Sequence, residues 1–388
     1  MVNDSDVCVI SPTIRNPEFI AEYVRNAKAN DFDTDRLFVV LITEDFCDTA
    51  DMRDMLDRLE VDGAVFAGPD RERWYERHGI DEYANLVPDA SHAETSFGLL
   101  YMWANAAFDY GIFLDDDTAP HPEFDFFGSH LDRLETRQTI EHVSSDTRWV
   151  NVLYQSFDRH GLYPRGYPYA AMDERIETEE KETDEIVASQ GLWTNIPDLD
   201  AVRILMDGDL NGQAQTRTRR DDFTNDFATA TGNFLTVCSM NLAFTREIIP
   251  AFYQFPMDDN EWDIGRFDDI WSGLTLKKAA DMLGTSVVTG FPLCEHNKAE
   301  RSTFADLNNE VPALELNEHF WKALDTAPDD AVDYVDAYDQ MIAAIDAYDF
   351  SPYANSGFMD FVVEKMEQWL KVIRELDDGI DAPNSEHK

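Results

Sequence analysis

The feature that most constrains the fold is an alternation of two kinds of segment in the first third of the chain. The short, apolar segments rich in β-branched or aromatic residues are "VCVISPTI", "RLFVVLIT", "GAVFAG" and "YGIFL". The longer segments between them that have helical spacing are "NPEFIAEYVRNAKA", "TADMRDMLDRLE" and "ETSFGLLYMWANAAF". Strands that alternate with helices in this way predict an α/β fold, with a mostly parallel central sheet and crossover helices.

Three of the predicted strands end in polar residues, in "SPTIRN", "TEDFCD" and "DDDTAP". Ligands of parallel sheets bind outside the carboxyl ends of the strands, so these ends predict a site. The third contains Asp115, Asp116 and Asp117, which cannot all be buried and ionised without a counter-ion. A divalent cation that prefers oxygen ligands would neutralise them. We therefore predict a metal site here. A solvated turn is the alternative, because acidic runs arise by chance among 78 acidic residues.

The charge of the chain limits its partners and its setting. It has 31 basic and 78 acidic residues, a net charge of -47, yet 44% of its residues are hydrophobic and 12% aromatic, which argues against disorder. An acidic surface poor in lysine fits a cytoplasm at molar salt, where the Debye length falls to about 3 Å and self-repulsion is screened. We expect a halophilic protein. The same charge argues against nucleic acid as a partner, because phosphates require a basic surface.

The cysteines and the apolar segments indicate the compartment. The four cysteines have no CxxC spacing, so neither a zinc site nor a disulfide framework is predicted. The N-terminus, "MVNDSDVCVI", lacks the basic region and long apolar run of a signal peptide. The longest nearly apolar stretch, "FGLLYMWANAAF", is too short to span a bilayer. We expect a cytoplasmic protein without a membrane span.

Two further clusters and one loop carry side chains suited to catalysis or binding. Asp268 and Asp269 in "DIGRFDDIWSG" can act as a base or orient a sugar hydroxyl, or can favour the dipole of the following helix. His296 and Lys298 in "EHNKAE" can bind a metal or a phosphate, although a lone histidine is more often structural. The loop "LYPRGYPY" is stiff and presents a single cation, Arg165.

The rest of the chain predicts the domain organisation. The segment 172–190 is rich in charge and favours a solvated loop or an exposed helix. After about residue 312 the chain reads as helices without a catalytic cluster. We predict an α/β domain over residues 1–311 and a helical extension over 312–388, which covers the sheet or makes a dimer contact.

Seven short motifs carry a family resemblance. In chain order they are "PTIRN", "DDD", "RGYPY", "GLWTNIPDLD", "MNLAFTRE", "IGRFDDIW" and "HNKA". They follow the order found in the reversibly glycosylated polypeptides, best known as plant UDP-arabinopyranose mutases, and the chain resembles that family from about residue 7 to about residue 310. The resemblance implies a GT-A-like nucleotide-sugar fold and a divalent metal, manganese or magnesium, at Asp115, Asp116 and Asp117.

The resemblance also implies roles for individual residues. UDP would bind near Thr13 and Arg15, with Glu44 and Asp45 at the next strand end. Arg165 matches the arginine that accepts a sugar reversibly in that family. A charged guanidinium is a poor nucleophile, so Asp268 or Asp269 would take a proton during transfer, while the metal and Lys298 stabilise the leaving UDP. Two alternatives for Arg165 remain open: a bidentate clamp on the diphosphate and a structural turn residue.

Three functions from different classes follow. The first is a UDP-sugar mutase that glycosylates itself reversibly. The second is a glycosyltransferase that moves a sugar from a UDP-sugar to a surface glycan or protein acceptor. The third is a non-catalytic protein that binds nucleotide sugar within a homo- or hetero-oligomer.

Overall fold

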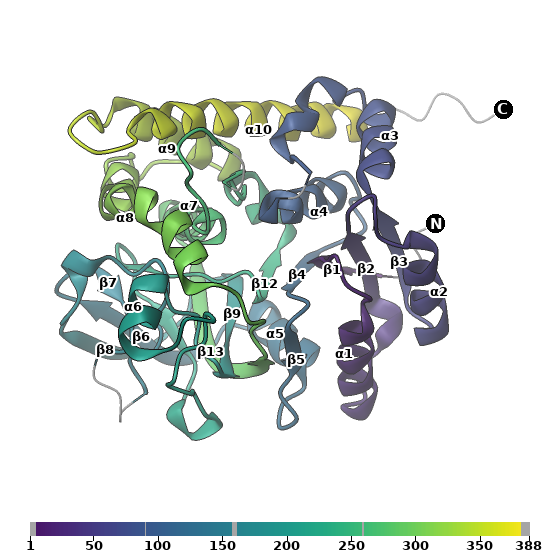
Figure 1. Ribbon diagram of the computed structural model, residues 1–388, viewed down its shortest axis with the longest axis horizontal. Coiled ribbons are helices and arrows are strands. Elements are labelled where there is room, and N and C mark those ends of the chain that lie inside the picture. Colours follow the sequence, from purple (N-terminus) through teal and green to yellow (C-terminus); the bar gives the residue numbers. More distant parts are fainter. Residues whose placement is uncertain (1–4, 90, 157–160, 258–259, 382–388) are drawn as a thin grey trace.

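The computed structural model describes residues 5–89, 91–156, 161–257 and 260–381 (Figure 1). Four N-terminal strands lie where the sequence predicts them: β1 (Val7–Pro12), β2 (Leu37–Ile42), β3 (Asp62–Phe66) and β4 (Tyr110–Leu114). The three expected helices between them are α1 (Glu18–Ala29), α2 (Thr49–Leu59) and α4 (Thr95–Trp103). A further helix, α3 (Gly68–His78), follows β3 and was not predicted. Its side chains are mostly charged, so the apolar pattern that indicates a helix is weak there.

These strands form one half of an eleven-stranded sheet among the described residues. β3, β2, β1 and β4 pair in parallel, and β12 (Asn241–Thr245) is antiparallel to β4. β9 (Ile186–Asn195) and β13 (Ser286–His296) follow, parallel to each other and pointing the same way as β4. β10 (Phe227–Thr229), β6 (Thr139–Ser145) and β8 (Ile176–Glu182) complete the far edge, and β5 (Thr118–Pro120) pairs with β13. The predicted α/β fold with a mostly parallel central sheet is confirmed.

The prediction for the charged segment 172–190 is wrong. Its first part forms β8, which pairs with β6 at the edge of the sheet and exposes almost every side chain. Charged residues on an edge strand are compatible with pairing on one side only, and they discourage pairing with another chain. Its last part enters β9, which is buried in the middle of the sheet.

The C-terminal region is helical, as predicted. α7 (Asp268–Leu283) precedes β13, and α8 (Thr303–Asp325), α9 (Tyr334–Ala347) and α10 (Gly357–Asp381) follow it. Figure 1 shows α9 and α10 on one side of the molecule, with α4 and α7 between α10 and the sheet. The indole of Trp369 on α10 donates to the Pro250 carbonyl at 3.1 Å and stacks on Tyr253. Buried side chains of α9 and α10 belong to the same hydrophobic cluster as those of the sheet.

Three observations concern the predicted domain boundary, the predicted absence of a membrane span and the cysteines. The boundary that we predict between residues 311 and 312 lies inside α8, which is continuous across it. Within the described ranges, no helix combines the length and the apolar character that a membrane crossing requires. Cys8, Cys238 and Cys294 are buried and Cys47 is half-buried.

Candidate functional site

A cavity of about 480 Å³ lies at the carboxyl ends of β1, β2, β4 and β13. Eleven of the residues that we predict for the site line it: Thr13, Arg15, Glu44, Asp115, Asp116, Asp117, Arg165, Asp268, Asp269, His296 and Lys298. Asp45 is absent from this lining. Its Oδ1 accepts a hydrogen bond from the Gly68 amide at 3.0 Å, at the start of α3, where the first amides lack partners within the helix.

The acidic turn after β4 is held from two sides. The Thr13 hydroxyl donates to Asp116 Oδ2 at 2.8 Å, and Arg15 Nη1 lies 3.2 Å from Asp116 Oδ1. On the other side, Asp117 Oδ2 accepts from the Ala299 amide at 3.4 Å and lies 3.7 Å from His296 Nε2. Thr13 and Arg15 therefore orient the acidic turn, and both line the cavity.

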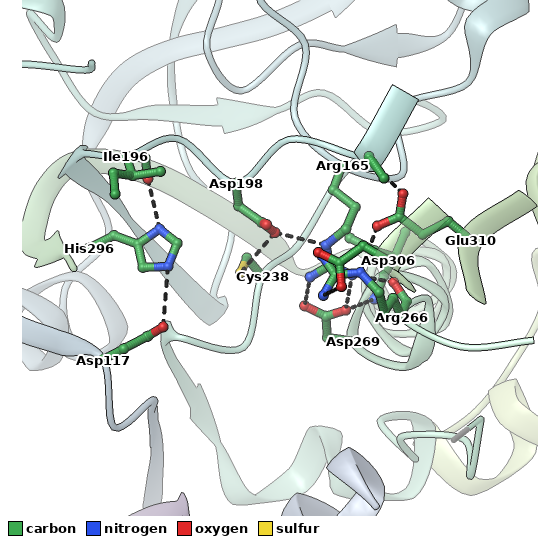
Figure 2. A network of polar contacts seen from close by, with 12 residues as sticks. Asp117, Arg165, Ile196, Asp198, Cys238, Arg266, Asp269, His296, Asp306 and Glu310 are labelled. Atoms are coloured by element: carbon green, nitrogen blue, oxygen red, sulfur yellow. Dashed lines mark hydrogen bonds and ion pairs between the residues drawn. The ribbon is translucent and has the colours of Figure 1, made fainter. Parts of the chain in front are cut away.

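The electrostatics of this turn fit a bound cation. Burial, and then the negative charges of Asp117 and Asp269, raises the pKa of Asp115 to about 7, so a bound cation would stabilise its ionised form. Figure 2 shows His296 between the Ile196 carbonyl and Asp117. Because that carbonyl only accepts, His296 Nδ1 carries the proton and Nε2 faces the carboxylate, the orientation typical of metal-binding histidines.

The protein side chains supply only part of a metal site. In the part of the chain that the structure describes, no group of three or more His, Cys, Asp or Glu is arranged to hold a metal by itself. The predicted ligands Asp115, Asp116 and Asp117 therefore do not form a complete metal site on their own. A cation that contacts these carboxylates would need ligand or water oxygens to complete its coordination, and oxygen ligands suit Mn²⁺ or Mg²⁺.

The loop that carries Arg165 is fixed by its neighbours. Gly166 has φ of +83°, and a Cβ there would lie 2.4 Å from Ile270 Cγ2 on α7. Asn317 on α8 donates to the Gly166 carbonyl at 2.9 Å, and the Arg165 amide donates to the Asp198 carbonyl at 2.9 Å. The stiffness that the prolines and the glycine predict is therefore completed by contacts with α7 and α8.

The Arg165 guanidinium is buried among carboxylates. Nε donates to Asp198 at 2.9 Å, Nη1 and Nη2 donate to the two oxygens of Asp269 at 2.9 and 2.8 Å, and Nη1 also donates to the Arg266 carbonyl (Figure 2). Burial lowers the pKa of Arg165, but Asp198 and Asp269 outweigh it and raise the pKa well above its ordinary value. Asp269 is the neighbour that binds Arg165 in bidentate fashion, whereas Asp268 lines the cavity at the start of α7.

Sequence reasoning missed Asp198 as a site residue. Burial alone would raise its pKa, but the cations Arg165, Lys298 and Arg266 lower it to about 2, so it stays ionised. Asp198 lies three residues after β9, and β9 ends at the same sheet edge as β4 and β13. The motif "GLWTNIPDLD" therefore carried the signal, since it is a strand that ends in buried carboxylates.

Arg266 and helix α8 support Arg165 from behind. Arg266 has φ of +66°, which is unusual for a residue with a side chain. Its Nε donates to Glu310 Oε1 at 2.6 Å, and its Nη1 lies 3.7 Å from Asp306 Oδ1. Glu310 is fully buried and also accepts from the Ala201 amide at the start of α6 (Ala201–Asp207). These contacts keep the Arg266 carbonyl turned toward Arg165.

Lys298 is a buried cation whose ammonium lacks a hydrogen bond. Its side chain is 7% exposed, and Nζ has no partner within hydrogen-bond distance among the described residues. Burial lowers the pKa of Lys298, and Asp198 acts in the opposite direction. A buried ammonium without a partner is unfavourable unless a ligand compensates it.

A second carboxylate cluster on the cavity wall was also missed. Glu94 precedes α4, lines the cavity and accepts a hydrogen bond from Arg71 of α3. Burial raises the pKa of Glu94 to about 7, Arg71 opposes this, and a hydrogen bond with Glu44 adds to the rise. The predicted residue Glu44 therefore lies beside another acid on the cavity wall.

Comparisons with known proteins show the family of this chain. The model of the family described as reversibly glycosylated polypeptide matches residues 84–378. The probable UDP-arabinopyranose mutase 2 of Solanum tuberosum is 32% identical over 248 residues, 62% of this chain and 60% of that protein. The UDP-arabinopyranose mutase 1 of Arabidopsis thaliana is 32% identical over 217 residues, 55% of this chain and 53% of that protein. The chain thus spans less than two thirds of the length of these relatives.

Solved structures resemble the chain more distantly. A glucosyl-3-phosphoglycerate synthase from Mycobacterium tuberculosis is 14% identical with a TM-score of 0.40, over 81% of this chain and 80% of that one. A mannosyltransferase from Pyrobaculum calidifontis, solved with GDP-mannose and Mn²⁺, is 13% identical with a TM-score of 0.36, over 98% of this chain and 88% of that one. The family match, which covers most of the chain and includes the acidic turn, Arg165 and Lys298, decides the assignment: this chain belongs to the reversibly glycosylated polypeptide family.

Proposed function

We propose that this protein is a UDP-sugar mutase that moves a sugar reversibly between UDP and Arg165 and so interconverts ring forms of the sugar. One observation carries the proposal. A single cavity is lined by an acidic strand end, by the unpaired ammonium of Lys298 and by a carboxylate-bound arginine. Its curated relatives bear the name UDP-arabinopyranose mutase, which supports the same reaction class.

Lys298 is the better candidate for binding the diphosphate. Four of the five N–H donors of Arg165 already bind Asp198, Asp269 and the Arg266 carbonyl, so its fork is not free to clamp a phosphate. The buried ammonium of Lys298 has all three donors available among the described residues. A diphosphate oxygen would supply the charge-assisted hydrogen bonds that it lacks.

A divalent cation, Mn²⁺ or Mg²⁺, would be held by Asp115 and Asp117 together with diphosphate or water oxygens, with His296 beside Asp117 and with Asp116 oriented by Thr13 and Arg15. When bound, it would neutralise the excess carboxylate charge of this turn and offset charge on the departing diphosphate.

The transfer assigns a role to Asp269. Arg165 Nη2 forms a bond to the anomeric carbon while the bond from that carbon to the diphosphate oxygen breaks, and UDP leaves with the electron pair. The proton lost from Nη2 passes to Asp269 Oδ2, which accepts that N–H at 2.8 Å. The guanidinium keeps its single positive charge, so Asp198 retains its ion pair throughout.

The tethered sugar can then change its ring. The bond between the anomeric carbon and the ring oxygen breaks as Nη2 forms a double bond to that carbon. The ring oxygen takes the proton from Asp269, and Asp269 takes the remaining proton of Nη2, so the group keeps a single positive charge. A different sugar hydroxyl then adds to the same carbon and gives its proton to Asp269, while the proton held by Asp269 returns to Nη2. Attack by bound UDP then reverses the transfer and frees Arg165.

Intact-mass spectrometry tests the proposal directly. Protein, Mg²⁺ and UDP-pentoses or UDP-hexoses are mixed in high salt, and we expect a one-sugar increase in mass that excess UDP reverses. Arg165→Ala should abolish the adduct and retain UDP binding, whereas Tyr169→Phe, on the same loop, should form it. If no UDP-sugar gives an adduct, reversible glycosylation is refuted. Chromatography of the nucleotide sugars then separates a ring-form change from transfer to an external acceptor.

A further inference from the structure

Asp198 shares a cavity with the two cations that the proposed function uses, Arg165 and Lys298, and both cations lower its pKa. β9 and β13 are parallel neighbours with Asn195 opposite His296, so Asp198 and Lys298 leave adjacent strands at the same edge of the sheet. Both side chains line the cavity, and the residues are only 5% and 7% exposed. Two buried groups of opposite charge in one cavity interact more strongly than they would at the surface.

Asp198 meets these cations in two different ways. Its Oδ2 accepts a direct hydrogen bond from Arg165 Nε at 2.9 Å (Figure 2). Lys298 makes no hydrogen bond to it, so that attraction acts through space. Asp306, whose charge also raises the pKa of Lys298, is already paired with Arg266 and Arg301. Asp198 is thus a carboxylate that attracts both Lys298, the proposed diphosphate ligand, and Arg165, the proposed sugar acceptor.

We propose that Asp198 is a counter-ion shared by Lys298 and Arg165, and that it couples nucleotide binding to the orientation of the acceptor. This rests on the proposed function of the cavity. Without nucleotide, the carboxylate charge opposes the entry of a diphosphate. Once a phosphate neutralises the charge of Lys298, the remaining interaction of the Asp198 carboxylate in this pair of cations is its hydrogen bond with Arg165. Its charge therefore weakens nucleotide binding, while its oxygen fixes the Nε edge of the guanidinium.

The two effects separate in two variants. Asp198→Asn removes the charge but keeps an oxygen that can accept the Nε–H, whereas Asp198→Ala removes both. Asp200→Asn is a matched control. That carboxylate is buried two residues away, but it caps α6 by accepting from the Arg203 amide, and it also accepts from the Tyr169 hydroxyl. Its hydrogen bonds in the described structure do not include Arg165.

Calorimetric titration with UDP and Mg²⁺ measures the charge effect. We expect both Asp198 variants to bind UDP about fivefold more tightly than the wild type, and Asp200→Asn to bind it equally well. In a Lys298→Met background, Asp198→Asn should no longer tighten binding, because the cation that it screens is gone. Unchanged or weaker UDP binding in Asp198→Asn overturns the proposal, as does equal tightening in the Lys298→Met background.

The rate of adduct formation measures the positioning effect. Asp198→Ala should form the Arg165 adduct about tenfold more slowly, and Asp198→Asn should recover most of that loss. Equal slowing in both variants overturns the positioning role. The binding arm requires no sugar transfer, so a wild type without any adduct refutes the proposed function while the UDP titrations still decide whether Asp198 is shared.

Discussion

Replacing Gly166 by alanine tests whether the Arg165 loop is as tightly constrained as the structure indicates. Two independent effects should add. Gly166 has φ of +83°, a conformation that costs an L-residue about 1–2 kcal/mol. Its new Cβ would also lie 2.4 Å from Ile270 Cγ2, and overpacking of this kind costs about 1–3 kcal/mol. We expect Gly166→Ala to lower the free energy of unfolding by about 2–5 kcal/mol.

Gly79 provides the matched control, because it separates the two effects. It has φ of +72° at the end of α3, and a Cβ there would meet nothing within 4 Å. Gly79→Ala should therefore show only the backbone cost of about 1–2 kcal/mol. Adding Ile270→Ala to Gly166→Ala removes the clashing atoms, so the double variant should lose less stability than the sum of the single variants.

Urea unfolding at constant high salt measures these stabilities, and intact-mass spectrometry measures the adduct. Ile270 is adjacent to Asp269, so the clash should also displace the carboxylate that binds Arg165 and slow adduct formation. If Gly166→Ala is no more destabilising than Gly79→Ala, the contact with α7 does not constrain the loop and the reasoning fails. The reasoning would also fail if the stability loss of the double variant equalled the sum of the losses of Gly166→Ala and Ile270→Ala.

Three further predictions concern the acidic residues of the site. Burial raises the pKa of Glu94 from 4.5 in the unfolded chain to about 7 in the folded protein. As the pH rises from 4.5 to 7, the unfolded chain releases this proton before the folded protein does, so the free energy of unfolding of the wild type should fall by about 3 kcal/mol. Glu94→Gln should lack this slope; parallel pH profiles for the two proteins would contradict the assignment. Asp116→Asn keeps an acceptor for Thr13 but loses the charge that pairs with Arg15, so it should weaken metal-dependent UDP binding about tenfold in calorimetry. Unchanged binding would show that Asp116 does not support the metal site. Glu310→Ala should lower the free energy of unfolding in urea by about 3–5 kcal/mol, because it leaves the buried charge of Arg266 without this partner. Glu315 is exposed on the same helix, so Glu315→Ala should change it little.

Much of the site was predictable because parallel strands bring their carboxyl ends to one edge. Side chains after β1, β2, β4 and β13 meet in the cavity for that reason, and only Asp45 turns away. Neighbouring side chains at a strand end point in different directions. The side chain of Asp45 points toward the start of α3, where the amides lack partners within the helix, and it accepts a hydrogen bond from Gly68. The strand pattern does not show which of two adjacent acids, Glu44 or Asp45, will do this.

Residues whose roles depend on tertiary contacts were not predictable. Asp198 acquires its role from Arg165, 33 positions earlier, and from Lys298, and neither pairing leaves a local pattern. Glu310 lies in a helical stretch with no reactive residues nearby in sequence, yet it holds Arg266. The strand β8 was missed because its exposed charges resemble a solvated segment.

Helix α8 makes the two walls of the cavity mechanically dependent on each other. Glu310 holds Arg266, and Asn317, about two turns further along, binds both the Gly166 carbonyl and the Trp271 indole. A sideways shift of α8 would move the Arg165 loop and Arg266 together, so their positions relative to each other would not change. Substitutions of side chains in the contact between α8 and α9 can therefore change the distance from Arg165 to the strand ends, although they alter none of the reacting groups.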